Sequence, residues 1–310
     1  MNKPKKYVYS AIGSVVIILL LLVLLNTTHR EASISTVQAT STIQSEREMG
    51  PFDLIEIEAK SAYVYDIVNK KVLYQKNPNL QLPLASLTKV MTALVASEIS
   101  STTATIQIDP KFLNADDNNG LIPHEKWTLK NLSDFSLVVS SNNGADVIAS
   151  VMGSMLDSGD GNDAFIQRMN LEAKRLGLRQ TYFLNGSGLD VTDSISGGYG
   201  SAKDVATLFE TVLNRDPHLL EATTYPEIKV KSENQTHKAT NTNKMVDIFP
   251  SVLASKTGFT DLAGGNLAVA FAVGPMHPII AVVMNSTVDS RFEDMEKLVK
   301  ATVASMPSND

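Results

Sequence analysis

Apolar and polar positions along this chain follow two periods, and each period predicts a different kind of element. Residues 62–66 and 72–75 are rich in β-branched and aromatic side chains and flank a short polar connection, which predicts a β-hairpin. A helix is expected from about Ser86, because apolar residues then recur at the spacing of a helix packed against a core. These apolar residues are Leu87, Val90, Met91, Leu94 and Val95.

The middle of the chain has the helical period, and its last part contains two apolar segments of strand length. Clusters of Gly, Asn and Asp separate the helices predicted at 129–139, 145–156, 164–176 and 202–213. Residues 266–273 and 278–285 predict a second hairpin, and a closing helix is expected at 291–304. Strands at both ends of a mostly helical insert predict an α+β fold, in which helices flank an antiparallel sheet assembled from distant segments.

An unbroken apolar segment lies close to the N-terminus. Lys3, Lys5 and Lys6 precede residues 7–25, which contain no ionisable side chain except tyrosine. A helix of about 20 residues crosses a membrane and its positive flank stays in the cytoplasm, so a single-pass transmembrane helix with residues 1–6 as its cytoplasmic tip is expected. The alternative is a cleaved signal peptide, whose apolar region is usually shorter, about 7–15 residues.

The segment after the predicted membrane anchor is polar and follows neither period. Residues 26–54 are therefore interpreted as a flexible linker, followed by one folded domain over residues 55–306 and a tail at 307–310. Because the first residues are placed in the cytoplasm, this domain is expected outside the cytoplasmic membrane, on its cell-wall or periplasmic side.

Composition excludes several classes of function. The 310 residues are 43% hydrophobic and 19% charged, and the net charge of −6 lacks the basic footprint of a nucleic-acid-binding protein. There is no cysteine, and the five histidines show no metal-ligand spacing, so neither a metal nor another cofactor is expected. Residues 114–120, followed by Glu125, nearly match a calcium loop, but the glycine falls one place late and a polar loop is the interpretation.

Ser86 and Lys89 are candidates for a nucleophile and its base. They are three residues apart at the predicted helix start, where both side chains lie on one face of the helix. A serine becomes a nucleophile when a neighbour takes its proton, and a lysine can do so if burial or nearby positive charge lowers its pKa. The pair alone equally fits an exposed helix start with a solvated lysine.

Two further polar clusters follow. Ser141 and Asn143 lie on a predicted turn between helices, where a hydroxyl can relay a proton and an amide can hold a peptide backbone, although the same residues also form ordinary helix caps. Lys256, Thr257 and Gly258 precede the second hairpin, where they suit a carboxylate and the close approach of a substrate backbone, or else form a surface turn. In this order, S-x-x-K, S-x-N and K-T-G form the signature of penicillin-interacting serine enzymes.

From about Ala59 to its end, the chain resembles the low-molecular-weight penicillin-binding proteins that act as serine D-alanyl-D-alanine carboxypeptidases. The likeness extends to residues 62–66 (AYVYD), 86–94 (SLTKVMTAL), 183–189 (FLNGSGL), 241–244 (NTNK), 256–264 (KTGFTDLAG) and 290–294 (SRFED). Two departures stand out. Pro83-Leu84-Ala85 replaces the usual Pro-Ala before the nucleophile, and the β-rich C-terminal domain of many relatives is not expected.

The resemblance implies removal of the terminal D-alanine from peptidoglycan stem pentapeptides and covalent inhibition by β-lactam antibiotics. It also implies these roles: Ser86 is the acylated nucleophile, Lys89 its base, Ser141 a proton relay, Asn143 a substrate-binding amide, Lys256 and Thr257 carboxylate ligands beside Gly258, and Arg291 a supporting cation. The N–H groups of Ser86 and Phe259 would form the oxyanion hole. For Arg291, a local pairing with Glu293 or Asp294 is an equal alternative.

Three other functions remain as alternatives. A DD-endopeptidase uses the same acylation chemistry on peptide cross-links. A class A β-lactamase shares the motifs but adds a glutamate that activates the deacylating water, and no E-x-x-L-N-like segment lies between Ser141 and Lys256. A catalytically silent wall-binding protein would have kept the fold, but the intact set of motifs argues against it.

Overall fold

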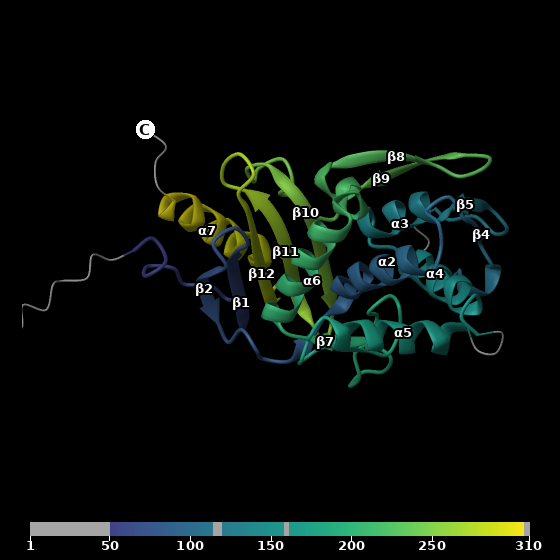
Figure 1. Ribbon diagram of the computed structural model, residues 1–310, viewed down its shortest axis with the longest axis horizontal. Coiled ribbons are helices and arrows are strands. Elements are labelled where there is room, and N and C mark those ends of the chain that lie inside the picture. The colour runs from purple at the N-terminus through teal and green to yellow at the C-terminus, as the bar shows by residue number, and fades with distance from the viewer. Residues whose placement is uncertain (1–49, 114–119, 158–160, 307–310) are drawn as a thin grey trace, which may run out of the picture. The chain divides into compact units, whose positions relative to one another are not determined.

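Segments from both ends of the described chain form the central sheet. The computed structural model describes residues 50–113, 120–157 and 161–306, all within one unit of the chain. In this part of the chain, five antiparallel strands have the order β10-β11-β12-β1-β2 (Figure 1). Their bounds are Ser61–Asp66 (β1), Lys71–Lys76 (β2), Val252–Thr260 (β10), Gly264–Ala272 (β11) and Pro278–Ser286 (β12). Both predicted hairpins are confirmed, and pairing of β1 with β12 joins them.

Helices pack on both faces of this sheet, which explains why its central strands are almost entirely apolar. Successive side chains of a strand point to opposite faces. On one face lies the helix α7 (Ser290–Ser305), and on the other lies the cluster that includes α6 (Ala202–Arg215). On β12 the side chains toward α7 are Ile279, Ala281 and Val283, and those on the opposite face are Ile280, Val282 and Met284.

The segments between β2 and β10 form a helical region, which apart from α6 lies beside the β10 end of the sheet (Figure 1). Besides α6, its α-helices are α2 (Thr88–Ile99), α3 (Leu129–Val138), α4 (Asn142–Ser154) and α5 (Gly161–Arg175). Its short 3-10 helices are η1 (Ala85–Leu87), η2 (Pro110–Phe112), η4 (Pro217–Leu219) and η5 (Glu221–Thr224). The predicted helices are confirmed to within a few residues, except that Ser86 lies in η1 and α2 itself begins two residues later.

Three small sheets complete the described part of the chain. They comprise β3 (Leu82–Pro83), β7 (Gly198–Gly200) and β6 (Tyr182–Phe183), then β4 (Thr105–Gln107) with β5 (Lys126–Thr128), and β8 (Glu227–Lys231) with β9 (Thr236–Thr240). The hairpin β8–β9 was not predicted, although Ile228 and Val230 alternate with charged residues as in a half-buried strand.

The predicted transmembrane helix at 7–25, most of the linker at 26–54 and the tail at 307–310 lie outside the described residues. Within residues 50–113, 120–157 and 161–306, no helix is both long and apolar enough to cross a membrane. The near-match to a calcium loop at 114–120 also falls mostly outside them. Glu125, which follows it, is buried and accepts a hydrogen bond from the indole of Trp127 at 3.0 Å.

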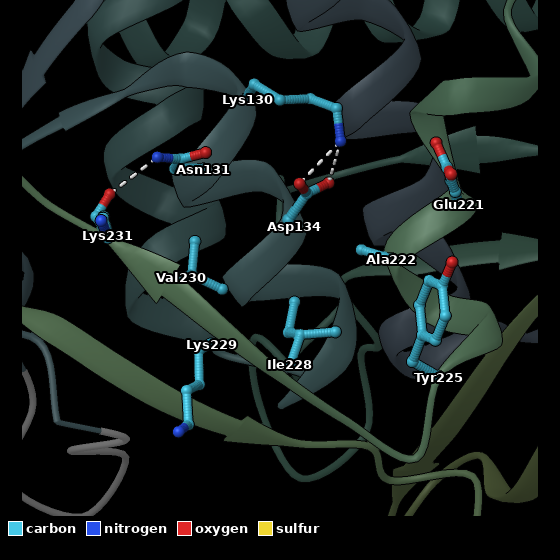
Figure 2. Close-up of a pocket in the computed structure, with 10 residues that line it drawn as sticks. All are labelled: Lys130, Asn131, Asp134, Glu221, Ala222, Tyr225, Ile228, Lys229, Val230 and Lys231. Atoms are coloured by element: carbon cyan, nitrogen blue, oxygen red, sulfur yellow. Dashed lines mark hydrogen bonds and ion pairs between the residues drawn. The ribbon is translucent and has the colours of Figure 1, made fainter.

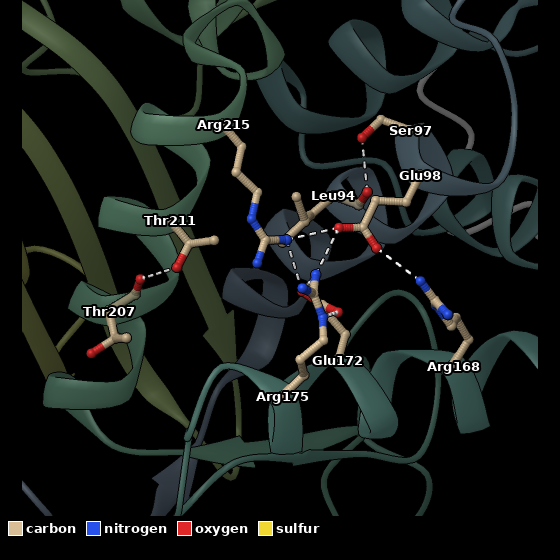
Figure 3. A network of polar contacts seen from close by, with 9 residues as sticks. All are labelled: Leu94, Ser97, Glu98, Arg168, Glu172, Arg175, Thr207, Thr211 and Arg215. Carbon is tan, nitrogen blue, oxygen red and sulfur yellow. Dashed lines mark hydrogen bonds and ion pairs between the residues drawn. The ribbon is translucent and has the colours of Figure 1, made fainter.

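Five charged side chains join α2, α5 and α6 at the C-terminal end of α2 (Figure 3). Glu98 pairs with Arg168 at 3.0 Å, Arg175 at 3.2 Å and Arg215 at 2.7 Å. Glu172, with its side chain 1% exposed, pairs with Arg175 at 2.6 Å and Arg215 at 2.8 Å. Burial alone would raise the pKa of Glu172, but the hydrogen bonds from the two arginines outweigh it and lower the pKa. The network therefore fixes one end of α2.

The substitution Glu172→Gln tests this network. We expect the variant to be less stable at pH 7 by about 1–2 kcal/mol, because two arginines lose a buried carboxylate, and its Tm to fall by about 3–8 °C. The folded-state pKa of Glu172 is lowered, so its contribution is present at neutral pH and is lost as the carboxyl group takes up a proton in acid. Thermal unfolding measured from pH 7 down to about pH 3 should therefore show the two proteins converging.

Glu233→Gln is the control, because Glu233 is half exposed and pairs with Lys126 only at 3.8 Å. We expect its Tm to match that of the unmodified protein within about 2 °C. Equal losses in both variants, or a loss in Glu172→Gln that does not shrink in acid, would contradict the proposed role of the buried pair.

Candidate active site

The turn that carries Ser86 has an unusual backbone. Ala85 has a φ of 49°, and Ser86 follows it in η1 immediately before α2. A residue other than glycine in this region costs on the order of 1 kcal/mol or more, so its surroundings must hold the turn. One contact that does so is a hydrogen bond from Leu84 N to Gly198 O of β7, at 2.9 Å.

Lys89 lies directly beside the serine hydroxyl. Its Nζ is 2.7 Å from Ser86 Oγ, 2.7 Å from Asn142 Oδ1 and 2.8 Å from Ser187 O. The side chain is almost fully buried, with 2% of Lys89 exposed. The predicted pair is therefore in contact, and the interpretation of Lys89 as a solvated surface lysine is wrong.

Ser141 is the N-cap residue of the helix α4. Its Oγ accepts a hydrogen bond from Gly144 N at 3.1 Å, so it caps the helix. The residue before it, Ser140, has a φ of 61°, and the residue after it, Asn142, contacts Lys89. Asn143 lies in the first turn of α4 and is 3% exposed.

Lys256 reaches the same segment from β10. Its Nζ donates to Ser140 Oγ at 2.9 Å and to Thr257 O at 2.8 Å. Burial, followed by the positive charges of Lys89 and Arg291, holds the pKa of Lys256 well below its ordinary value of 10.5. Thr257 is hydrogen-bonded through its hydroxyl to Thr242. An anion placed here would relieve the repulsion between the cations.

Gly258 brings β10 against the turn around Ser86. A Cβ atom at this position would lie 2.9 Å from Leu84 O and 3.2 Å from Ser86 N. The strand and the turn can approach this closely only because the residue is glycine. Phe259 follows, with 49% of the residue exposed at the surface.

Arg291 supports β10 from α7. Its Nη1 donates to Gly258 O at 2.8 Å, and the residue is 8% exposed. Among the described residues, no ion pair joins Arg291 to Glu293 or Asp294; the carboxylate of Asp294 instead accepts hydrogen bonds from the backbone of residues 58 and 59. Burial lowers the pKa of Arg291. Of the two alternatives for Arg291, the structure therefore supports contact with the K-T-G strand.

The three motifs thus converge, and the contacts between them involve residues that the sequence did not single out. Asn142 and Ser140 each bind one of the two lysines, Ser187 offers its carbonyl to Lys89, and Thr242 binds Thr257. Ser187 and Thr242 lie in segments 183–189 and 241–244, whose family resemblance was the available signal. No pattern in the sequence marks Ser140.

A hollow of about 420 Å3 lies apart from these residues, between α3, η5 and β8 (Figure 2). Its lining includes the ion pair of Lys130 with Asp134, and burial raises the pKa of Asp134. None of the predicted catalytic residues lines this hollow. In the described part of the chain, no group of three His, Asp or Glu side chains is arranged to hold a metal ion.

A buried lysine against a serine hydroxyl, with a second buried lysine bound to the nearby Ser140, is an arrangement suited to a serine enzyme that transfers acyl groups. The chain belongs to the D-alanyl-D-alanine carboxypeptidase family, peptidase family S11, whose model matches residues 44–288. The family predicted from the sequence is therefore confirmed.

Individual relatives agree with this assignment. D-alanyl-D-alanine carboxypeptidase DacF of Bacillus subtilis is 30% identical over 249 residues, which cover 78% of this chain and 61% of DacF. The D-alanyl-D-alanine endopeptidase of Escherichia coli is 29% identical over 244 residues, covering 74% of this chain and 72% of that protein. This chain thus spans less than two thirds of the length of DacF.

A solved structure shows the same fold. Penicillin-binding protein D2 of Listeria monocytogenes, in its ampicillin-bound form, superimposes with a TM-score of 0.69 at 28% identity, covering 80% of this chain and 98% of that chain. The predicted α+β penicillin-binding fold is confirmed by this likeness.

The substitution Lys256→Met tests the electrostatics of the site. The folded-state pKa of Lys256 is lowered, so its charge opposes folding at neutral pH, and this penalty disappears as the pH rises through 10.5, where the unfolded chain also loses the proton. We expect a Tm higher than that of the unmodified protein at pH 7 and a difference that shrinks toward alkaline pH. Because a charge-assisted contact is lost, kcat/KM for a D-Ala-D-Ala peptide should fall about 10- to 100-fold.

Lys238→Met is the matched control, because Lys238 is an exposed lysine on β9 that pairs with Glu227 at the surface. Its Tm and kcat/KM should remain unchanged at every pH. A Tm of Lys256→Met that is lower than that of the unmodified protein at pH 7 and independent of pH would show that the buried charge does not oppose folding.

Proposed function

We propose that this protein is a serine DD-carboxypeptidase that removes the terminal D-alanine from peptidoglycan stem pentapeptides. The observation that carries the proposal is the 2.7 Å contact between Lys89 Nζ and Ser86 Oγ, in a turn whose backbone lies against the K-T-G strand. Membership of the D-alanyl-D-alanine carboxypeptidase family supports the same substrate.

The reaction proceeds through an acyl-enzyme. Ser86 Oγ attacks the carbonyl carbon of the penultimate D-alanine while Lys89, in its neutral form, takes the hydroxyl proton. The proton passes by way of Ser141 to the leaving amine as the peptide bond breaks, and free D-alanine departs. Water then attacks the ester on Ser86, which releases the shortened peptide and returns the proton to the serine.

The carboxylate at the end of the substrate has a matching site. Lys256 and Thr257 would bind it, with Arg291 adding positive charge through β10, and Asn143 would hold the peptide backbone. β10 is the edge strand of the sheet, so an extended peptide can pair with it. The N–H groups of Ser86 and Phe259 would stabilise the oxyanion, a contribution that is typically worth about 10²–10³-fold in rate per donor.

A DD-endopeptidase is the second candidate, because a protein of that name is also among the relatives that match this chain. Both activities break the same kind of bond, and they differ in whether the leaving group is free D-alanine or a cross-linked stem peptide. Mass spectrometry of products from a pentapeptide and from a cross-linked muropeptide dimer separates them. Release of D-alanine without cleavage of the dimer is the expected result.

For residues 1–54 we propose a single-pass anchor at 7–25 in the cytoplasmic membrane and a linker at 26–54, with the domain from residue 55 outside the membrane. The flanking lysines and the unbroken apolar segment support this placement. Peptidoglycan stem peptides lie on that side of the membrane. Penicillins are expected as covalent inhibitors, since the Listeria relative was solved in an ampicillin-bound form.

Replacing Ser86 by alanine should remove both activities that depend on the acyl-enzyme. We expect no covalent labelling by a fluorescent penicillin and a loss of D-alanine release of about 10⁴-fold or more, as for other catalytic serines. Labelling is measured by gel fluorescence, and D-alanine by a coupled oxidase assay.

Ser97→Ala serves as its control, because Ser97 lies on α2, the helix that follows the turn of Ser86, and its hydroxyl bonds only to Leu94 O among the described hydrogen bonds. This variant should keep full labelling. Persistent labelling of Ser86→Ala would assign the nucleophile to another residue.

The anchor is tested by introducing two lysines into the apolar segment, Leu20→Lys with Leu22→Lys. Each lysine near the middle of a membrane helix opposes insertion by about 2.5–3.5 kcal/mol, so the variant should leave the carbonate-washed membrane fraction in which the unmodified chain remains. Leu54→Lys, a substitution outside the segment, should have no effect. Recovery of the unmodified chain without its first 40 or so residues would instead identify a cleaved signal peptide.

A further inference from the structure

Asn266 links the central sheet to the turn that carries Ser86. It lies on β11 and is completely buried. Its Nδ2 donates to Pro83 O and to Leu84 O, each at 3.0 Å, and its Oδ1 accepts from Asn285 N at 2.8 Å. Carbonyl groups only accept and a backbone N–H only donates, so these partners fix the orientation of the amide.

The position of Asn266 in the sheet relates it to the K-T-G motif. In the antiparallel pairing of β10 with β11, Asn266 is the partner of Gly258. Gly258 is the residue that lies against Leu84 O and Ser86 N. The same turn is therefore in contact with both members of one cross-strand pair: the strand β10 touches it through glycine, and β11 holds it through the amide.

The hydrogen bonds reach the turn where its backbone is least regular. They end on the carbonyl groups of residues 83 and 84, immediately before Ala85 with its φ of 49°. Hydrogen bonding at these two carbonyls limits how far the following residues can move away from the sheet. The backbone N–H of Ser86 lies only two residues beyond the second of them.

We propose that Asn266 is a positioning residue, which fixes the turn at residues 83–86 against β10 and thereby sets the spacing between the N–H groups of Ser86 and Phe259. This inference rests on the proposed acyl-transfer function, because the two N–H groups matter as a pair only if an oxyanion forms between them. Asn266 itself does not touch the substrate. Its effect is transmitted through the carbonyl groups of Pro83 and Leu84.

A purely structural role of Asn266 and a positioning role predict different effects of its substitution. A buried amide that only satisfies two carbonyl groups would contribute to folding, and its loss would lower the Tm without a selective effect on catalysis. A positioning role requires a loss in kcat and in the affinity for a tetrahedral adduct, with KM little changed. The terminal carboxylate is bound elsewhere, by Lys256 and Thr257.

Asn266→Asp and Asn266→Ser are the test variants of the full chain. The aspartate has the same shape but loses both donors, and the serine retains one donor and introduces no charge. We expect kcat for D-alanine release to fall by about 10²–10³-fold in Asn266→Asp, the loss typical of a disturbed oxyanion site, and by a smaller factor in Asn266→Ser. KM should change by less than about threefold, since carboxylate binding is retained.

The second readout is the affinity for a peptide boronic acid ending in the D-alanine analogue, which forms a tetrahedral adduct with the active serine. It should weaken by the same factor as kcat/KM in both variants, because the adduct and the transition state use the same two N–H groups. If Asn266→Asp does not fold, Asn266→Ser alone tests the proposal, since its hydroxyl retains one donor for the carbonyl groups of Pro83 and Leu84.

Asn170→Asp is the matched control. Asn170 also joins two elements through its amide, with Nδ2 to Phe183 O at 2.8 Å and Phe183 N to Oδ1 at 2.8 Å, but it lies on α5 and these bonds do not reach residues 83–86. It should lower the Tm and leave kcat unchanged. Equal kcat in Asn266→Ser and the unmodified chain would overturn the proposal, whereas absence of D-alanine release and penicillin labelling in the unmodified chain would overturn the proposed function instead.

Discussion

The structure depends on keeping two buried lysines close together at one site. Lys89 and Lys256 are each 2% exposed, and burial, followed by repulsion from Lys89 and Arg291, lowers the pKa of Lys256. Lys256 Nζ is hydrogen-bonded to a hydroxyl and a carbonyl oxygen. The hydrogen bonds of Lys89 Nζ include those to a hydroxyl, an amide and a carbonyl oxygen. The two oxygen atoms at Lys256 belong to uncharged groups, so an anion bound beside them would offset the charge of this lysine.

The short segment 140–142 contacts both lysines. Ser140 and Asn142 send their side chains to different lysines, and Ser141 between them caps α4. The left-handed backbone of Ser140 and that of Ala85 stand immediately before the two motif serines. Such conformations persist only where neighbouring contacts hold them, which agrees with their concentration at this site.

Local patterns predicted most of the fold and several of the residues that the structure brings together. The hairpin near residue 62, the helices of the insert and the apolar hairpin near residue 270 follow from periodicity, because each buries a face that its own sequence marks. The triplets around Ser86, Ser141 and Lys256 were identified by their order. The exact start of α2 was not predictable, because a left-handed alanine before Ser86 is imposed by contacts with β7 and β10 rather than by its own preference.

What the sequence did not reveal is which neighbours complete the site. Ser140, Ser187 and Thr242 are ordinary polar residues, and they matter because the chain returns to the same point from distant segments. The two strands of the β8–β9 hairpin were overlooked for a related reason, since each has only five residues and a polar outer face. Contacts of this kind are properties of the assembled fold and leave only a weak local signal.

β10 is an edge strand of the central sheet, and helices cover both faces of that sheet. An unpaired strand edge is normally a hazard, because any extended chain can add to it and begin aggregation. Here η1 and η5 pack against β10 and cover part of the strand. The same two elements therefore restrict both self-association at this edge and the size of a peptide that can pair with β10. Changes in η1 or η5 that admit bulkier molecules should also make the protein less soluble.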